Sequence, residues 1–188
     1  SYEAMRVAYT AIFDRIGFNY RLVSAHSGAM GGSGSAEFQI LVQSGEDIIA
    51  ACLQCSYAAN LEVASTPPMA RRGDPAATPA REKVATPKRR TIDEVSDFLG
   101  KAPESFLKSL LYVAGDEVVM AVVRGDHELN EVKLAQALGV AEVFMAGAED
   151  VKKATGAEVG FAGPVGFSGK RITVTGQRTG SEIAGSMS

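Results

Sequence analysis

A proline-rich, basic stretch between Ser65 and Arg90 constrains the fold of this chain more than any other feature. It contains five of the seven prolines, and its seven basic and two acidic residues give it a net charge of +5. It has few apolar side chains and no hydrophobic period, which is typical of an exposed, semi-extended connection. We therefore predict two units, residues 1–64 and 91–188, joined by a linker over residues 65–90.

The basic charge of this linker has two interpretations. The whole chain carries a formal net charge of −3, so the residues outside the linker carry −8. The basic side chains, Arg89 and Arg90 among them, suit contacts with nucleic-acid phosphates. A basic linker that is merely solvated explains the composition equally well, so both interpretations stay open.

Length and composition set the class of protein. With 188 residues and 46% hydrophobic side chains, the chain is long enough for one or two small domains with their own cores. No apolar run approaches the roughly 18 residues that a membrane-spanning helix needs, and residues 1–5 do not resemble a secretory signal. Two cysteines exclude a disulfide framework. Together these features favour a cytoplasmic protein with reduced thiols and no membrane partner.

The pattern of the first unit predicts a helix followed by strands. Apolar side chains recur at helical spacing over residues 1–16, and Gly17 suits the left-handed conformation that ends a helix. Residues 18–24 alternate apolar and polar side chains, as a half-buried strand does. A glycine-rich segment, residues 28–34, leads to a further strand at residues 38–42.

The glycine-rich segment and the two cysteines favour structural roles. Residues 28–34 match neither the Walker spacing nor a dinucleotide-binding fingerprint, so a tight hairpin is favoured over a phosphate-binding loop. Cys52 and Cys55 form one CxxC pair. Zinc needs four ligands, and the two histidines, His26 and His127, lie far away in the sequence. We therefore expect a hairpin at the cysteines and no metal site.

The second unit mixes helices with apolar strands, which predicts an α+β fold. Thr91 and Glu94 form a capping box at the start of a short helix, and Pro103 suits a first helical turn, which predicts a second helix over residues 103–110. The other expected elements are strands at residues 111–114, 118–123, 143–145 and 169–175, and helices at residues 130–138 and 150–154. Residues 176–188 are rich in Gly and Ser and are predicted to be disordered.

The first unit carries a family resemblance in six runs of sequence: residues 1–5, 8–9, 12–15, 27–38, 44–47 and 55–60. These runs resemble the segment that follows the second signature motif of the class II catalytic core in bacterial-type prolyl-tRNA synthetases. The resemblance implies that residues 1–64 are a small α/β fragment of such a core. His26 and Ala36 depart from the pattern, because the family commonly has an acidic residue and a histidine there.

Four runs in the second unit point to the same family: residues 91–95, 108–111, 123–133 and 160–166. They resemble its editing insertion domain, of the YbaK type, over about residues 85–167, and the Arg-Gly-Asp-His-Glu-Leu-Asn run is the most specific of them. The resemblance implies a mixed, largely antiparallel sheet with short flanking helices. After Phe167 the family pattern fails, which indicates that the domain is shortened or atypical over residues 169–188.

The activity implied by this resemblance is hydrolysis of alanine wrongly esterified to proline tRNA. A pocket that accepts proline cannot keep out smaller alanine, because missing methylenes are worth only about 1–3 kcal/mol, so a second, smaller site is needed. By resemblance, Ile92 and Val95 wall that smaller pocket. They lie three residues apart on one predicted helix and would belong to the core in any case.

The catalytic residues are also implied by resemblance. Lys108 occupies the position of the family's essential lysine, where an ammonium meets phosphate or ester oxygens of the tRNA 3′ end. Gly160, Gly163 and Pro164 match the family's GxxxP loop, whose free N–H groups orient the aminoacyl carbonyl. Because no Ser-His-Asp or Cys-His set accompanies them, we expect water, assisted by the substrate's own ribose hydroxyl, to attack the ester.

The candidate tRNA contacts are Arg124, His127, Arg89 and Arg90. Editing implies no cofactor, whereas the parent ligase would use ATP and Mg²⁺. The implied partners are the acceptor end of tRNA(Pro), the remainder of the class II core and, for the parent, a second identical subunit. One alternative is a fragment of a proline–tRNA ligase that serves only as a tRNA-contacting structural module. We do not expect ligation from this chain alone, because it lacks the ATP-binding motifs of the core.

Overall fold

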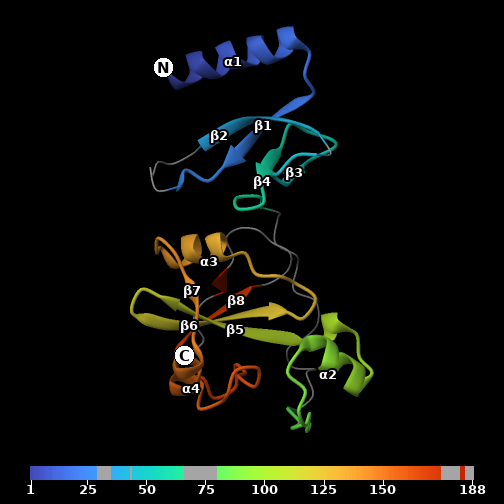
Figure 1. The fold of residues 1–188 in the computed structure, drawn as a ribbon, viewed down its shortest axis with the longest axis vertical. Helices are drawn as coiled ribbons and strands as arrows, with labels where there is room; N and C mark the ends of the chain where they lie inside the picture. The colour runs from blue at the N-terminus through green and yellow to red at the C-terminus, as the bar shows by residue number, and fades with distance from the viewer. Residues whose placement is uncertain (29–34, 43, 66–79, 175–182, 185–188) are drawn as a thin grey trace. The chain divides into compact units, whose positions relative to one another are not determined.

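The computed structural model describes residues 1–28, 35–42, 44–65, 80–174 and 183–184. The chain forms two compact units, Ser1–Ser65 and Thr66–Ser188, and in the described residues the first has one helix and the second has several, each unit with a mixed sheet (Figure 1). Of the predicted linker, residues 66–79 lie outside the described part, and residues 80–90 contain neither helix nor strand. The predicted α+β fold class is confirmed.

The first unit begins with α1 (Tyr2–Ile16), which ends as predicted at Gly17, whose φ of 79° is left-handed. The antiparallel strands β1 (Tyr20–Ala25) and β2 (Ser35–Ile40) follow. Residues 26–34 connect them, so the hairpin is confirmed but is longer than the tight turn expected, and residues 29–34 lie outside the described part.

A second hairpin completes the sheet of the first unit. It joins β3 (Ile49–Ala51) to β4 (Ala58–Asn60), and β4 pairs in parallel with β1, which gives the order β2-β1-β4-β3. Cys52 and Cys55 lie in the connection, as predicted, and the Cys52 N–H donates to the Tyr57 carbonyl at 2.9 Å. Among the described residues, no group of three or more His, Cys, Asp or Glu is placed to hold a metal ion.

The sheet of the second unit has the order β7-β5-β6-β8-β9. Its neighbours are antiparallel except for the parallel pair β6 and β8. Residues 119–123 of the central strand β6 are at most 4% exposed, as the unbroken apolar run predicted. The strands are β5 (Leu107–Ala114), β6 (Glu117–Arg124), β7 (Phe144–Met145), β8 (Lys170–Val174) and β9 (Ile183–Ala184).

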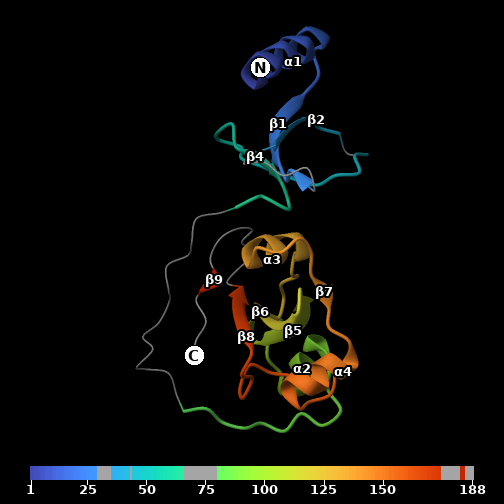
Figure 2. The ribbon, with the colours of Figure 1, turned by 90° about the vertical axis from the view of Figure 1, so that its left-hand side faces the viewer.

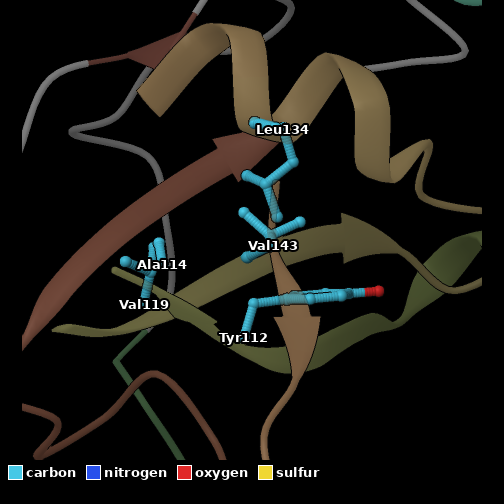
Figure 3. Packing of buried hydrophobic residues seen from close by; sticks show 7 residues of the cluster. Tyr112, Ala114, Val119, Leu134 and Val143 are labelled. Atoms are coloured by element: carbon cyan, nitrogen blue, oxygen red, sulfur yellow. The ribbon is translucent and has the colours of Figure 1, made fainter. Parts of the chain in front are cut away.

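Helices cover both faces of this sheet (Figures 1 and 2). On one face α3 (Glu131–Leu138) packs Leu134 against Tyr112 and Val143 (Figure 3). On the other face α4 (Ala148–Thr155) contributes Val151 to a cluster with Met120. The short helix α2 (Ile92–Leu99) precedes β5. No helix in the described part of the chain is long and apolar enough to span a membrane.

The predicted helix over residues 103–110 is wrong. Pro103–Ser105 form one turn of 3-10 helix, η3, and β5 begins at Leu107. Pairing of β5 with β6 over its whole length satisfies the backbone groups of this segment, and this tertiary pairing overrides the local helix signal. Lys108 therefore lies on a strand.

The C-terminal predictions have mixed outcomes. The strand predicted at residues 169–175 is confirmed as β8. Of the tail predicted to be disordered, residues 176–182 and 185–188 lie outside the described part, whereas Ile183 and Ala184 pair with β8 as β9.

Candidate functional site

The first turn of α2 is held by the predicted capping box. Thr91 Oγ1 accepts the Glu94 N–H at 3.2 Å, and Glu94 Oε2 accepts the N–H groups of Arg90 and Thr91 at 2.7 and 3.1 Å. These backbone bonds favour the carboxylate and hold the pKa of Glu94 below its usual value. The box thus fixes the backbone of Ile92, the first residue of the helix, and of Arg90, two residues earlier.

Ile92 packs against the end of β6. The N–H of Gly125 donates to the Phe106 carbonyl at 2.8 Å, which extends the pairing of β5 and β6 by one residue. A Cβ at Gly125 would lie 3.1 Å from Ile92 Cγ2 and under 3.0 Å from the Pro103 carbonyl, a separation that real Cβ atoms essentially never show. Glycine is therefore required for the Pro103 carbonyl to approach this end of the sheet, and it also leaves room for the Ile92 side chain. Val95, one turn further along α2, is half-buried.

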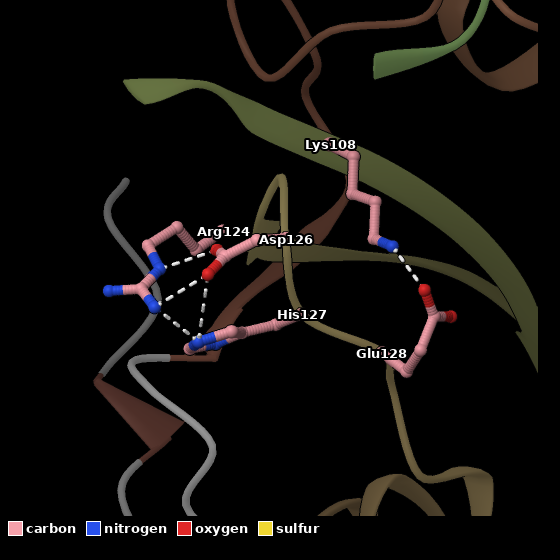
Figure 4. A network of polar contacts seen from close by, with 5 residues as sticks. All are labelled: Lys108, Arg124, Asp126, His127 and Glu128. Carbon is pink, nitrogen blue, oxygen red and sulfur yellow. Dashed lines mark hydrogen bonds and ion pairs between the residues drawn. The ribbon is translucent and has the colours of Figure 1, made fainter. Parts of the chain in front are cut away.

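Lys108 lies one residue into β5, opposite Val123, and its Nζ is 2.9 Å from Glu128 Oε1 (Figure 4). Because side chains alternate along a strand, Lys108 shares the face of Tyr112, which is the face under α3. Its side chain is 20% exposed, whereas that of Glu128 is 92% exposed. An ion pair with so exposed a carboxylate contributes little stability.

Arg124, the last residue of β6, forms a network with Asp126 and His127 of the turn that follows (Figure 4). The Arg124 guanidinium donates twice to Asp126, at 2.6 and 2.8 Å, and Nη2 lies 2.7 Å from His127 Nε2. The guanidinium bond lowers the pKa of Asp126, and the carboxylate raises the pKa of Arg124. His127 is 6% exposed, and its Nδ1 is buried without a hydrogen-bond partner in the described structure. Arg124 and His127 thus bind each other within the turn.

The GxxxP loop lies beside Arg90. Gly160 has a φ of 88°, and a Cβ there would lie 3.1 Å from the Cβ of Arg90. The Arg90 guanidinium lies over the Phe161 ring, 5.1 Å from its centroid. A Cβ at Gly163 would have no described heavy atom within 4 Å, and Pro164 is half-buried. The described contacts of the loop with Arg90 are thus made at Gly160 and Phe161, the first two residues of the loop.

The structure brings some of the predicted site residues together. The segment from Arg90 to Ile92 contacts the loop at Gly160 and the end of β6 at Gly125. Lys108 lies near the start of β5, which pairs with the end of β6, and it is on the face of the sheet under α3. Ala162 of the loop packs instead against the cluster on the opposite face, under α4. Arg89 lies over the Phe98 ring at 5.5 Å.

Three residues of this arrangement were missed by the sequence interpretation. Glu128 lies in the Arg-Gly-Asp-His-Glu run, but its pairing with a lysine twenty residues earlier depends on the sheet. The contact of Phe161 with Arg90 depends on tertiary packing in the same way. Gly125 could have been found, because a glycine directly after a buried strand often marks a close approach of another backbone.

Comparison with known proteins gives a family model, curated relatives and solved structures. Residues 86–175 match the model of the family described as the aminoacyl-tRNA editing domain. The chain is 48% identical over 172 residues to a proline–tRNA ligase of Geobacter metallireducens and 51% identical over 171 residues to one of Solidesulfovibrio magneticus. These alignments cover 92% and 89% of this chain but only 30% and 29% of the relatives, so the chain spans under a third of their length. A solved structure described as a candidate trans-editing enzyme for prolyl tRNA synthetase is 25% identical, with a TM-score of 0.42 over 47% of this chain and 55% of that chain.

Proposed function

We propose that this chain hydrolyses alanine esterified to proline tRNA, because its residues 86–175 match the aminoacyl-tRNA editing domain and because it is 48% identical over 172 residues to a proline–tRNA ligase. The observation that carries the proposal is the position of the first turn of α2. Arg90, two residues before the helix, contacts the GxxxP loop at Gly160, and Ile92 contacts the end of β6 at Gly125, next to the strand that bears Lys108.

Ile92 and Val95 act in this proposal as a size filter. Both are half-buried and lie one turn apart on α2. Ile92 is held between the capping box and Gly125, so it has little freedom to move aside for a larger amino acid. A rigid aliphatic wall admits the methyl group of alanine and rejects the pyrrolidine ring of proline, which reverses the selectivity of a pocket that accepts proline.

Lys108 supplies positive charge to the tRNA 3′ end. In the free protein its ammonium binds the exposed Glu128 carboxylate. A phosphate or ester oxygen of the substrate takes the place of this carboxylate, and the ammonium then stabilises the negative charge that develops on the oxygen during hydrolysis. Glu128 thus keeps Lys108 oriented without preventing substrate binding.

The reaction we propose is direct attack of water on the ester. The water oxygen adds to the alanyl carbonyl carbon, the bond from this carbon to the tRNA ribose oxygen breaks, and one proton of the water passes to the ribose oxygen. The products are free alanine and the ribose hydroxyl of the tRNA. The N–H groups of the loop that contains Gly160, Gly163 and Pro164 orient the carbonyl, and the neighbouring ribose hydroxyl directs the water. This chemistry needs no cofactor. ATP, Mg²⁺, the rest of the core and a second subunit would serve ligation by a full-length relative.

A deacylation assay tests this function. The full 188-residue chain is incubated with alanyl-tRNA(Pro) and, separately, prolyl-tRNA(Pro), and release of the amino acid is followed. We expect hydrolysis of the alanyl ester only, with a loss of about a hundredfold or more in Lys108→Ala. Lys153→Ala, which removes an exposed lysine of α4, serves as the matched control and should react like the wild type. Equal rates for Lys108→Ala and the wild type would overturn the proposal.

A further inference from the structure

Arg90 lies between two parts of the proposed site. Its backbone N–H donates to Glu94 Oε2 at 2.7 Å, which fixes Arg90 to the first turn of α2. Two residues later, Ile92 packs beside Gly125. The backbone of Arg90 therefore has a fixed position relative to the proposed wall of the alanine pocket.

The side chain of Arg90 extends along the GxxxP loop. A Cβ at Gly160 would lie 3.1, 3.3 and 3.4 Å from Cβ, Cγ and Cδ of Arg90, so the aliphatic stem occupies the space that glycine leaves free. The guanidinium continues over the Phe161 ring at 5.1 Å. Arginine side chains commonly combine stem packing with attraction of the cation to a ring face. Arg90 thus contacts two successive residues of the loop.

The segment before the loop also borders Arg90. A hollow of about 330 Å³ is lined by Arg90, by Ala148 and Lys152 of α4, and by Glu158 and Val159. The Phe161 N–H donates to the Glu158 carbonyl at 3.0 Å, which closes the turn that begins the loop. Arg90 therefore contacts Gly160 and Phe161 and lines one hollow with the two residues that precede Gly160.

We propose that Arg90 is a positioning residue for editing. It holds the loop that begins at Gly160 against the first turn of α2, so that the N–H groups of the loop and the Ile92 wall act on the same aminoacyl ester. This role rests on the proposed function. It differs from a phosphate contact, because the stem and the guanidinium are both engaged within the protein.

Kinetics of two variants of the full chain test this role. In Arg90→Ala, we expect kcat for alanyl-tRNA(Pro) to fall about tenfold or more with KM within about twofold, because the loop is displaced by a fraction of an ångström. In Arg90→Met, which keeps an unbranched stem beside Gly160, most of kcat should return. If both variants instead raise KM and weaken its dependence on salt, Arg90 contacts a phosphate and the positioning role is wrong.

Hydrogen exchange gives a readout that does not depend on catalysis. We expect the backbone amides of residues 158–163 to exchange about tenfold faster in Arg90→Ala, and at the wild-type rate in Arg90→Met, while α3 is unchanged in both. If the wild type does not hydrolyse alanyl-tRNA(Pro), the proposed function fails, and exchange alone decides whether Arg90 holds the loop. Unchanged loop exchange in Arg90→Ala, or equal acceleration in α3, would overturn the inference.

Discussion

Replacing Gly125 by alanine tests the close approach of the Pro103 carbonyl and the Ile92 side chain to the end of β6. The added Cβ would lie under 3.0 Å from the Pro103 carbonyl oxygen and 3.1 Å from Ile92 Cγ2. The φ of Gly125 is not positive, so the effect is one of space and not of backbone strain. The isoleucine can shift by a few tenths of an ångström, but the carbonyl belongs to the backbone and cannot rotate away.

The atoms around the added methyl group determine how much the free energy of unfolding should fall. Adding a methyl group to a well-packed site typically costs about 1–3 kcal/mol. The Pro103 carbonyl also accepts the Phe106 N–H at 3.1 Å, so displacing it weakens a hydrogen bond at the start of β5. We therefore expect the free energy of unfolding of the second unit to fall by about 3 kcal/mol, at the upper end of this range.

Native-state amide exchange of β6 measures this loss within the second unit alone. Since 1.36 kcal/mol corresponds to a factor of ten, Gly125→Ala should speed exchange of the most protected β6 amides about a hundredfold. Gly163→Ala is the matched control for stability, because in the described structure its Cβ would meet no heavy atom within 4 Å. Its effect should stay within about 0.5 kcal/mol. Equal exchange in the two variants would refute the claim that glycine is required at position 125.

Two further predictions concern the α3 face. Tyr112→Phe removes a hydroxyl that donates to Glu131 Oε1 at 3.1 Å and should lower the free energy of unfolding by about 0.5–1.5 kcal/mol in urea titrations. Burial, followed by the bond to Glu131, raises the pKa of Tyr112 to about 12. Its contribution is therefore present below the unfolded pKa of about 10 and is lost as the pH rises to about 12, so the wild type should lose stability over this window more steeply than Tyr112→Phe. Asn130→Ala removes the side-chain oxygen that accepts the Lys133 N–H and should shift the urea midpoint by the equivalent of about 1 kcal/mol, whereas Asn130→Gly should cost only a few tenths.

Local signals in the sequence predicted the helix boundaries well. The Thr91 and Glu94 pair caps α2, Asn130 caps α3, and Gly17 ends α1 in a left-handed conformation. Each signal works within four or five residues, because a cap needs only the orphan N–H or carbonyl groups of its own helix end. The buried run that became β6 was recognised for a similar reason, since a strand covered on both faces is apolar at every position.

Local signals failed where distant partners compete for the backbone. Pro103 does begin a turn, but the residues after it pair with β6, more than ten residues further along the chain, and form a strand. Neither this pairing nor its register can be read from a helical pattern in one segment. Lys108, which was predicted to lie on a helix, therefore lies on β5, on the face of the sheet under α3.

The sequence by itself determined the helix caps, the central strand and the family resemblance that selects the candidate residues. The tertiary structure alone decided which of these residues meet. It brings Ile92 to Gly125, Lys108 to Glu128 and Arg90 to Phe161. Contacts of this kind join segments that are 20 to 71 residues apart. They depend on how the sheet aligns its strands and places the segments at their ends, and no local pattern specifies which partner each residue meets.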